Sequence, residues 1–169
     1  VNTLNVRGEQ MIFELNGNDE KMLDSLLAIW LEGNLQAHSF ISKNYWLDNQ
    51  VGVREGLAQA RIFVKETDGK AVGFLGLVEE AIAGLFVKEQ FQKQGIGEAL
   101  IQRVKDEKKI LTLTVYENNQ AALLFYERQG FRRVRSQIDP ETQQREWLMR
   151  WTRDEKLQKG SRKKIDFNN

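Results

Sequence analysis

The spacing of apolar residues divides the first half of the chain into helices and strands. Leucines and a tryptophan recur every three or four positions between residues 19 and 35, which is typical of an amphipathic helix. A second, less regular helical stretch runs from about 46 to 60. Asp68-Gly69 is a hairpin signal between two apolar runs. Such runs predict four strands: 11–15, 61–66, 71–78 and 82–87.

The second half alternates strands and helices. Residues Ile110 to Tyr116 alternate apolar and polar side chains as a strand does. Asn119 stands at an N-cap position, and Gly130 stands where a left-handed residue ends a helix. The only proline marks the turn at Asp139-Pro140. Strands flank that turn at 131–137 and 145–151. This order predicts one α/β domain around a mixed, mostly antiparallel sheet.

The composition of the chain excludes several classes of protein and of metal site. The chain has 169 residues, enough for one domain with a proper core, and its net charge is +1. No cysteine is present, which excludes disulfides, thiolate metal sites and a cysteine nucleophile. A single histidine cannot form a multi-histidine metal site, so no metal is expected. No apolar run approaches the roughly twenty residues of a membrane span, and no signal peptide is visible. We therefore expect a cytoplasmic protein.

The domain is expected to span residues 11–151. Residues 1–10 are polar, lack periodicity and precede Met11, which indicates an upstream extension or a cloning remnant. Residues 152–169 carry six basic and three acidic side chains with little that could pack. We interpret them as a solvated basic tail, because no interleaved aromatic residues support a nucleic-acid contact.

A glycine-rich segment carries the clearest chemical signal. Residues 84–100 read as a buried strand, a polar loop and an amphipathic helix. Gly95 and Gly97 leave the backbone free of Cβ atoms at the start of that helix, where unpaired amides attract anions. This predicts a phosphate-binding loop. The P-loop motif fails because no Lys-Ser/Thr pair follows Gly97, and the dinucleotide motif fails because Leu100 replaces its third glycine. An ordinary glycine-rich turn remains the alternative.

Two motifs together resemble a known family. Gln92-x-x-Gly95-x-Gly97 after an apolar strand resembles the pyrophosphate loop of the GNAT superfamily of N-acetyltransferases, which bind acetyl-CoA. A second motif resembles the segment that follows this loop in the same superfamily: Asn119-x-x-Ala122-x-x-Phe125-Tyr126-x-x-x-Gly130-Phe131. The resemblance covers about residues 11–151. It implies a GNAT-like sheet, flanked by helices, whose two central strands lie parallel and splay apart.

The resemblance also implies roles for individual residues. The pantetheine arm of acetyl-CoA would pair with backbone beside Leu85 and Val87, and the amide of Val87 would face the charge developing on the thioester oxygen. Tyr126 would protonate the departing thiolate, with a buried structural aromatic as its alternative reading. The expected cofactor-binding residues are Leu85, Phe86, Val87, Gln92, Lys93, Gln94, Gly95, Ile96, Gly97, Glu98, Asn119, Ala122, Phe125 and Tyr126.

Candidates for the amine site lie earlier in the chain. Glu79 and Glu80 close the turn before the central strand and could accept a proton or attract a cation, although paired acids in a turn are often only solvated. Histidine ordinarily titrates near neutrality, so His38 is expected as a third candidate base, with a structural role equally open. The aromatic segment around it resembles the acceptor pocket of small bacterial superfamily members. Its substrate-binding candidates are His38, Phe40, Tyr45 and Trp46.

The favoured hypothesis is an acetyl-CoA-dependent N-acetyltransferase that acts by direct transfer in a ternary complex, since no cysteine is available to carry the acetyl group. The acceptor amine is left open among a peptide lysine, a protein N-terminus, an aminoglycoside-like drug and a polyamine. The rival hypothesis is a CoA-binding regulatory module that has lost catalysis. No membrane or specific nucleic-acid partner is expected, and a homodimer is left open.

Overall fold

The structure is a computed structural model that describes residues 11–16 and 18–153. The N-terminal extension predicted at 1–10 lies outside the described residues, as does most of the predicted basic tail. Seven strands form one sheet in the order β1-β2-β3-β4-β5-β7-β6. The strands are β1 (Ile12–Glu14), β2 (Arg61–Thr67), β3 (Lys70–Val78), β4 (Ala81–Val87), β5 (Ile110–Tyr116), β6 (Arg132–Ile138) and β7 (Arg145–Thr152).

Neighbouring strands pair antiparallel except at the centre, where β4 and β5 are parallel. This confirms the predicted mixed, mostly antiparallel sheet with a central parallel pair. Five helices and one short turn of 3-10 helix, η1, complete the described chain. They are α1 (Glu20–Ala37), α2 (Lys43–Asp48), α3 (Gln50–Gln59), η1 (Glu89–Phe91), α4 (Ile96–Lys105) and α5 (Gln120–Arg128).

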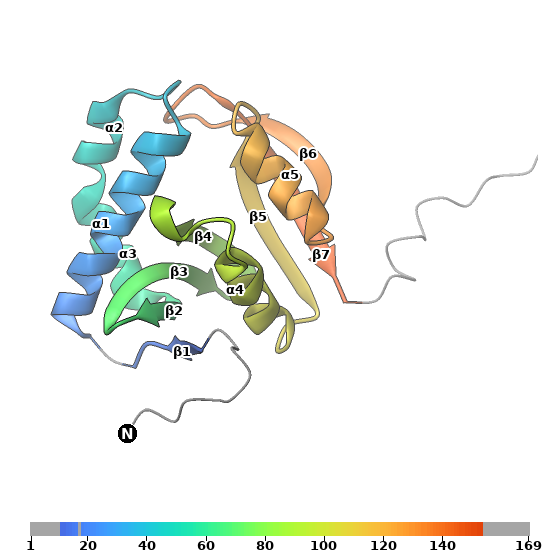
Figure 1. The fold of residues 1–169 in the computed structure, drawn as a ribbon. Coiled ribbons are helices and arrows are strands. Elements are labelled where there is room, and N and C mark those ends of the chain that lie inside the picture. The colour runs from blue at the N-terminus through green and yellow to red at the C-terminus, as the bar shows by residue number, and fades with distance from the viewer. Residues whose placement is uncertain (1–10, 17, 154–169) are drawn as a thin grey trace, which may run out of the picture.

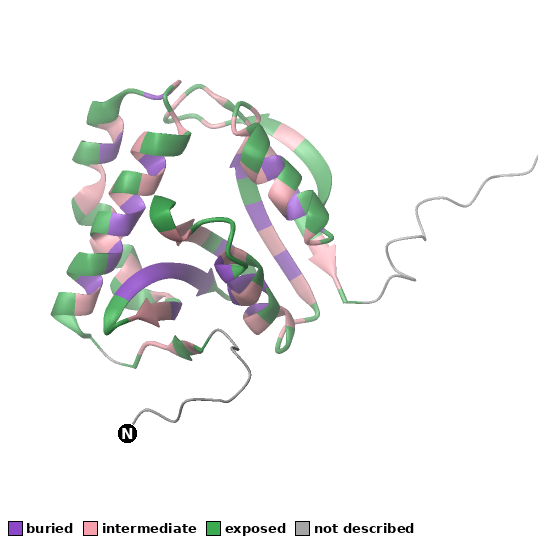
Figure 2. Ribbon diagram, viewed as in Figure 1, coloured by how far each residue is buried: buried purple, intermediate pink, exposed green. Residues whose placement is uncertain are grey.

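The helices cover both faces of the sheet (Figure 1). In β2, Ile62 and Val64 pack with Leu26 of α1, whereas Phe63 between them packs with Leu100 of α4. This is the alternation expected of a strand with two covered faces. Figure 2 shows the result, with β3 buried along most of its length and buried positions alternating along β5. The helices α1 to α3 therefore lie on one face, and α4 and α5 on the other.

The helical stretch predicted from about 46 to 60 is two helices, not one. It begins earlier, at Lys43, and α2 ends at Asp48 before α3 begins at Gln50. Asn49 separates them: its backbone N–H and its side-chain Nδ2 both donate to the carbonyl oxygen of Tyr45. A side chain that competes for a helix carbonyl interrupts a regular helix, which the hydrophobic spacing alone does not reveal.

The central strands diverge after a single pairing. Ala81 pairs with Thr112, and no further β4–β5 pair forms among the described residues. The register with β3 shifts between Gly76 and Leu77, which leaves Ala83 of β4 as an extra, bulged residue. In Figure 1 the carboxyl ends of β4 and β5 point in different directions. The edge of β4 that faces β5 is therefore without a strand partner beyond Ala81, as the predicted splayed pair requires.

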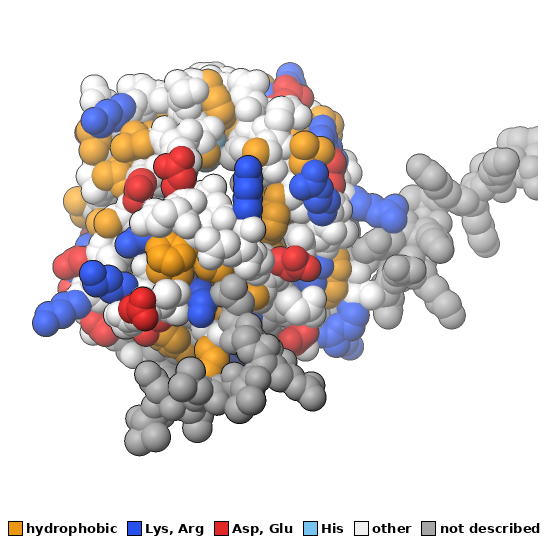
Figure 3. Space-filling model, viewed as in Figure 1, with side chains coloured by type: hydrophobic (Ala, Val, Ile, Leu, Met, Phe, Trp, Pro, Cys, Tyr) orange, Lys and Arg blue, Asp and Glu red, His pale blue; other side chains and the backbone are white. Residues whose placement is uncertain are grey.

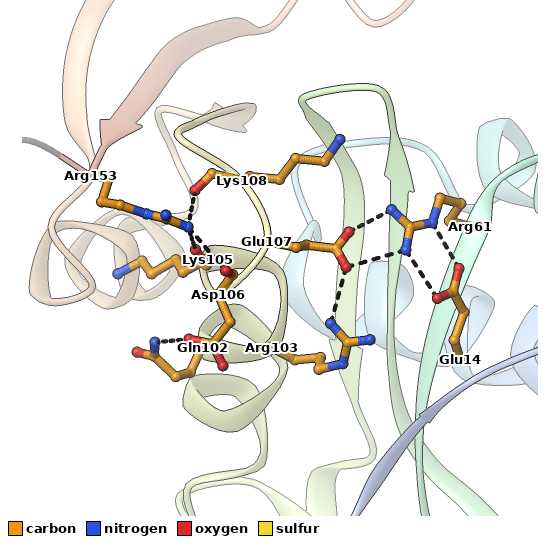
Figure 4. Close-up of polar contacts among 9 residues, drawn as sticks. All are labelled: Glu14, Arg61, Gln102, Arg103, Lys105, Asp106, Glu107, Lys108 and Arg153. Carbon is orange, nitrogen blue, oxygen red and sulfur yellow. Dashed lines mark hydrogen bonds and ion pairs between the residues drawn. The ribbon is translucent and has the colours of Figure 1, made fainter.

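The carboxyl end of the domain lies slightly beyond the predicted boundary at 151. Thr152 still pairs with Ile110, and Nη2 of Arg153 donates to the carbonyl oxygens of Lys105, Asp106 and Lys108 (Figure 4). These carbonyls lie at the end of α4 and just after it, so an arginine that follows β7 satisfies acceptors that a helix leaves open. Residues 152 and 153 thus belong to the folded domain.

Candidate active site

The predicted phosphate loop leads into α4. Gly95 is the N-cap residue with a φ of 82°, which favours glycine, and no side chain caps the helix. The first helical hydrogen bond runs from Ala99 N to Gly95 O, so the amides of Ile96, Gly97 and Glu98 have no acceptor within the helix. A Cβ atom added at Gly95 would meet no atom within 4 Å. This start of the helix is open and rich in donors, as an anion site requires.

The two loop glycines meet different needs. A Cβ atom at Gly97 would lie 3.2 Å from Cζ of Phe125, so Gly97 allows α4 to approach α5 closely. The loop before the helix is held by side-chain amides: Nε2 of Gln92 donates to Val87 O at 2.9 Å, and Nε2 of Gln94 donates to Gln90 O. Lys93 takes a positive φ of 59°. The sequence predicted open backbone at both glycines, and the structure places an aromatic ring at the second.

The β4 residues predicted to meet the cofactor face opposite ways. Leu85 packs against the core on the α4 side. The ring of Phe86 packs on the α1 side, 5.5 Å from Phe74, where a Cβ atom at Gly33 or at Gly84 would lie within 3 Å of it. Phe86 therefore fills space left by two glycines, one on α1 and one on its own strand. Its side chain belongs to the α1 face of the sheet.

Helix α5 carries the predicted acid. Asn119 is its N-cap and accepts from Ala122 N at 3.2 Å, as the sequence predicted for this cap. Tyr126 lies two turns later with 9% of its surface exposed, and its ring meets Phe125 and Phe131 edge-on at 5.2 and 5.7 Å. Burial raises the pKa of the Tyr126 hydroxyl above its usual range. The phenol is therefore protonated at neutral pH, the state that a proton donor needs.

The predicted amine-site residues gather after α1. The ring of His38 stacks on Trp46 at 5.4 Å and meets Phe40 edge-on at 5.5 Å, and Tyr45 meets Trp46 at 4.9 Å. Trp46 is buried, whereas the other three side chains are half-buried. The Nε2 atom of His38 lies 3.1 Å from Nδ2 of Asn119. The structure therefore brings the aromatic segment to the start of α5, beside the predicted cofactor residues.

Two tyrosine–carboxylate contacts, which the sequence did not predict, lie at this place. The hydroxyl of Tyr116 donates to Oδ2 of Asp139 at 2.6 Å, and that of Tyr45 donates to Oε2 of Glu141 at 2.8 Å. Burial and these hydrogen bonds to carboxylates raise the pKa of both phenols. Figure 1 shows the β6–β7 loop beside the α1–α2 connection. In the sequence, Asp139-Pro140 predicts a turn, and nothing nearby indicates that Asp139 and Glu141 meet two distant tyrosines.

Asp139 is ionised although it is partly buried. Burial opposes its ionisation, but hydrogen bonds from the Tyr116 hydroxyl, the Glu141 amide and Thr142 outweigh that effect and hold its pKa below the usual value. Phe40 and His38 both meet the ring of Tyr116 edge-on. Aromatic rings and carboxylates therefore adjoin here, a combination that suits a cation on an apolar stem.

The Glu79-Glu80 turn lies elsewhere on the sheet. Both side chains are exposed, Glu79 has a φ of 55°, and the carbonyl oxygen of Glu80 accepts from Thr112 N at 2.9 Å. This is the paired end of β4 and β5. Tyr116 lies four residues further along β5, a separation of about 13 Å at the usual rise of a strand. The structure therefore does not bring Glu79 and Glu80 to the aromatic segment, and their role stays a prediction.

The molecular surface has mixed charge. Figure 3 shows acidic and basic side chains interspersed on the face seen there, in keeping with a net charge of +1. Among the helices of residues 18–153, none is long and apolar enough to cross a membrane.

Comparison with known proteins agrees with this geometry. The family model for the acetyltransferase (GNAT) domain matches residues 58–133. The peptidyl-lysine N-acetyltransferase YiaC of Escherichia coli is 41% identical over 131 residues, which are 76% of this chain and 90% of that protein. The peptidyl-lysine N-acetyltransferase YjaB of Salmonella typhimurium is 33% identical, covering 69% of this chain and 81% of that protein.

Solved structures share the fold. The solution structure of apo-form YjaB from Escherichia coli superposes with a TM-score of 0.73 at 24% sequence identity, covering 83% of this chain and 97% of that one. An aminoglycoside 6'-N-acetyltransferase complexed with coenzyme A superposes with a TM-score of 0.64 at 15% identity, covering 84% and 96%. The motifs, the splayed sheet and the relatives agree, and the chain belongs to the GNAT superfamily of N-acetyltransferases.

Proposed function

We propose that this N-acetyltransferase transfers the acetyl group of acetyl-CoA directly to the side-chain amine of a peptidyl lysine. The observation that carries the choice of acceptor is the pair of tyrosine–carboxylate contacts, Tyr45–Glu141 and Tyr116–Asp139, beside an aromatic cluster. A lysine side chain is an ammonium group on an apolar stem. In this site, carboxylates can attract the ammonium group and aromatic rings can pack against the stem. Two relatives, YiaC and YjaB, carry the name peptidyl-lysine N-acetyltransferase.

The residues around the splayed strands fit acetyl-CoA. The uncapped amides of Ile96, Gly97 and Glu98 suit a pyrophosphate, and Gly95 leaves space before them. The β4 edge beyond Ala81 has no strand partner and is open to an extended arm, and Asn119 lies at the start of helix α5. Bound acetyl-CoA supplies an activated thioester. The residues named here hold and orient it beside the amine, which is where much of the rate enhancement of a two-substrate enzyme arises.

The protein's own groups manage charge and protons. Asp139 is ionised and attracts the incoming ammonium, whereas Phe40 and Tyr116 contact its stem. Glu79 and Glu80 remain candidates for the group that removes the ammonium proton before attack. Tyr126 keeps its proton at neutral pH and donates it from Oη to the leaving sulfur.

An amine panel tests this proposal. Acetyl-CoA consumption is measured with lysine peptides, a peptide with only a free N-terminal amine, an aminoglycoside and a polyamine. We expect turnover with the lysine peptides and an acetyl mark on the lysine Nζ by mass spectrometry. Initial rates at varied concentrations of both substrates should give intersecting lines, as direct transfer in a ternary complex requires. Parallel lines would indicate a covalent intermediate, and acetyl-CoA binding without turnover of any amine would favour the rival regulatory module.

A further inference from the structure

The only histidine of the chain is hydrogen-bonded through both ring nitrogens. Nδ1 of His38 lies 3.0 Å from Oδ1 of Asn34, and Nε2 lies 3.1 Å from Nδ2 of Asn119. Asn34 lies one turn earlier on α1 and is itself buried, with 3% of its surface exposed. Asn119 is 81 residues away in sequence and caps α5. His38 therefore connects the end of α1 to the start of the helix that carries Tyr126.

The outer partners of the two asparagines fix the proton on the imidazole. Nδ2 of Asn34 donates to the carbonyl oxygen of Trp30, which can only accept, so Oδ1 of Asn34 faces the ring. Oδ1 of Asn119 accepts from Ala122 N, which can only donate, so Nδ2 of Asn119 faces the ring. Nδ1 of His38 must then carry the hydrogen, and Nε2 must accept. Only one neutral tautomer of His38, with the hydrogen on Nδ1, satisfies both hydrogen bonds.

This arrangement leaves no group on His38 to remove a proton from an amine. The Nε2 lone pair is occupied by Asn119, and Nδ1 is already protonated. A second proton on Nε2 would point at the Nδ2 donor of Asn119 and break that contact. Burial among Trp46, Phe40 and Tyr116 lowers the pKa of His38 to about 4. The ring of His38 meets that of Tyr116, whose hydroxyl donates to Asp139. It also stacks on Trp46, which contacts Tyr45, and the hydroxyl of Tyr45 donates to Glu141.

We propose that His38 is a positioning residue, which holds Asn119 and the first turn of α5 in place through its neutral Nδ1–H form, and not the general base. This inference rests on the proposed function insofar as α5 carries the acid Tyr126 and the predicted acetyl-CoA contact Asn119. From Asn119 to Tyr126 is seven residues, or two helical turns. A shift of the cap therefore changes where both groups meet acetyl-CoA.

Nuclear magnetic resonance tests the tautomer without any assay of turnover. A uniformly ¹⁵N-labelled full chain has a single imidazole, so its long-range ¹H–¹⁵N correlations need no assignment. We expect the Nδ1–H pattern, unchanged from pH 8 to pH 6. An Nε2–H pattern, or a titration near neutrality, would overturn the inference even if the protein acetylated no lysine. Conversely, the expected pattern in a protein without turnover would contradict the proposed function alone.

Two substitutions separate positioning from base catalysis. In His38→Gln, the side-chain carbonyl can accept from Asn119 but cannot take up a proton, whereas His38→Phe keeps the ring stacking and removes both hydrogen bonds. We expect His38→Phe to raise KM for acetyl-CoA by about 3- to 10-fold, the effect of losing the hydrogen bond to Asn119 in particular, and His38→Gln to restore most of the affinity. Asn119→Ala should raise it similarly, and the Phe and Ala changes combined should be less than additive. Equal loss of kcat in the Gln and Phe variants would overturn the proposal.

A control lies in the same turn. Ser39 is exposed, and Ser39→Ala should leave KM for acetyl-CoA unchanged. Circular dichroism and thermal unfolding of each variant show whether a loss reflects misfolding. If the His38→Phe protein fails to fold, the His38→Gln variant still tests the proposal, because it changes the same position. A His38→Gln protein with near-normal kcat excludes His38 as the base by itself.

Discussion

The hydroxyl of Tyr116 at the end of β5 lies 2.6 Å from the carboxylate of Asp139 in the β6–β7 loop. Tyr45 of α2 makes a matching contact with Glu141 in the same loop. The loop is thus held by two elements that are far apart in the sequence, strand β5 and helix α2. These two hydrogen bonds hold the loop as one side of the proposed lysine site, and its carboxylates give that site negative charge.

Neutralising this loop should weaken acceptor binding. For Asp139→Asn combined with Glu141→Gln, we expect KM for a lysine peptide to rise about tenfold, since losing roughly 1.4 kcal/mol of attraction corresponds to that factor. Acetyl-CoA affinity, measured by calorimetry, should not change. A matched control removes the same charge from exposed acids away from the site, in Asp68→Asn with Glu55→Gln.

The same kinetic measurements test Glu79 and Glu80, the acids that the sequence suggests for the amine site. Glu79→Gln with Glu80→Gln should alter amine kinetics if either carboxylate removes the proton, and should spare acetyl-CoA binding. An unchanged lysine KM in the loop variant together with a raised KM in this one would place the acceptor beside the β3–β4 turn. The loop assignment would then be wrong.

Local chemistry explains why so much of the fold could be predicted. The alternation in Ile110 to Tyr116 gave the strand with its observed bounds, and Asn119 caps α5 as its side chain suggested. Gly130 takes a φ of 87°, the left-handed conformation expected at the end of that helix. The break at Asn49 escaped prediction because one side-chain hydrogen bond decides it, and the hydrophobic spacing continues across it.

The candidate site could be predicted only where neighbours in sequence create it. The loop from Gln92 to Gly97 is a local motif, and its open helix start follows from two glycines. The contact between Tyr45 and Glu141 joins residues 96 positions apart, so no local sequence pattern predicts it. The packing role of Gly97 could not be predicted for the same reason, because the ring that it accommodates comes from Phe125 on another helix.

The cofactor loop is tested by Gly95→Glu. A side chain with a negative charge at the open start of α4 should repel a pyrophosphate and raise the acetyl-CoA dissociation constant about tenfold or more. Gly69→Glu is the matched control, because Gly69 also has a positive φ, of 73°, and free space around it, but lies in the β2–β3 hairpin. Equal affinity in the two variants would contradict the loop assignment.

The stability of the domain at low pH should depend on Arg61. Its guanidinium pairs with Glu14 of β1 at 2.7 Å and with Glu107 after α4 at 2.5 Å, and Arg103 also pairs with Glu107 (Figure 4). Hydrogen bonds from Arg61 lower the pKa of both glutamates. Their stabilising effect is therefore fully present above the ordinary pKa of 4.5 and is lost as the pH falls through the lowered values.

Arg61→Gln should then lower Tm by about 2 to 4 °C at pH 7, and the difference from the unaltered protein should shrink toward pH 3. The control is Arg54→Gln, which removes a guanidinium paired with Glu20 and Asp24, both 69% exposed. We expect a smaller shift there, because exposed pairs are well screened by water. A Tm difference for Arg61→Gln that persists unchanged at pH 3 would show that packing over Phe63, and not charge, is the cause.

Replacing Tyr126 with Phe tests the acid. The ring would keep its edge contacts with Phe125 and Phe131, and only the hydroxyl would be lost. We expect kcat to fall about 10²-fold, within the usual range for a general acid, with little change in acetyl-CoA affinity. The rate of the variant should also depend on the leaving group, because a thiol of lower pKa departs without a proton. A variant with full kcat would mean that the thiolate leaves unassisted or that another group protonates it.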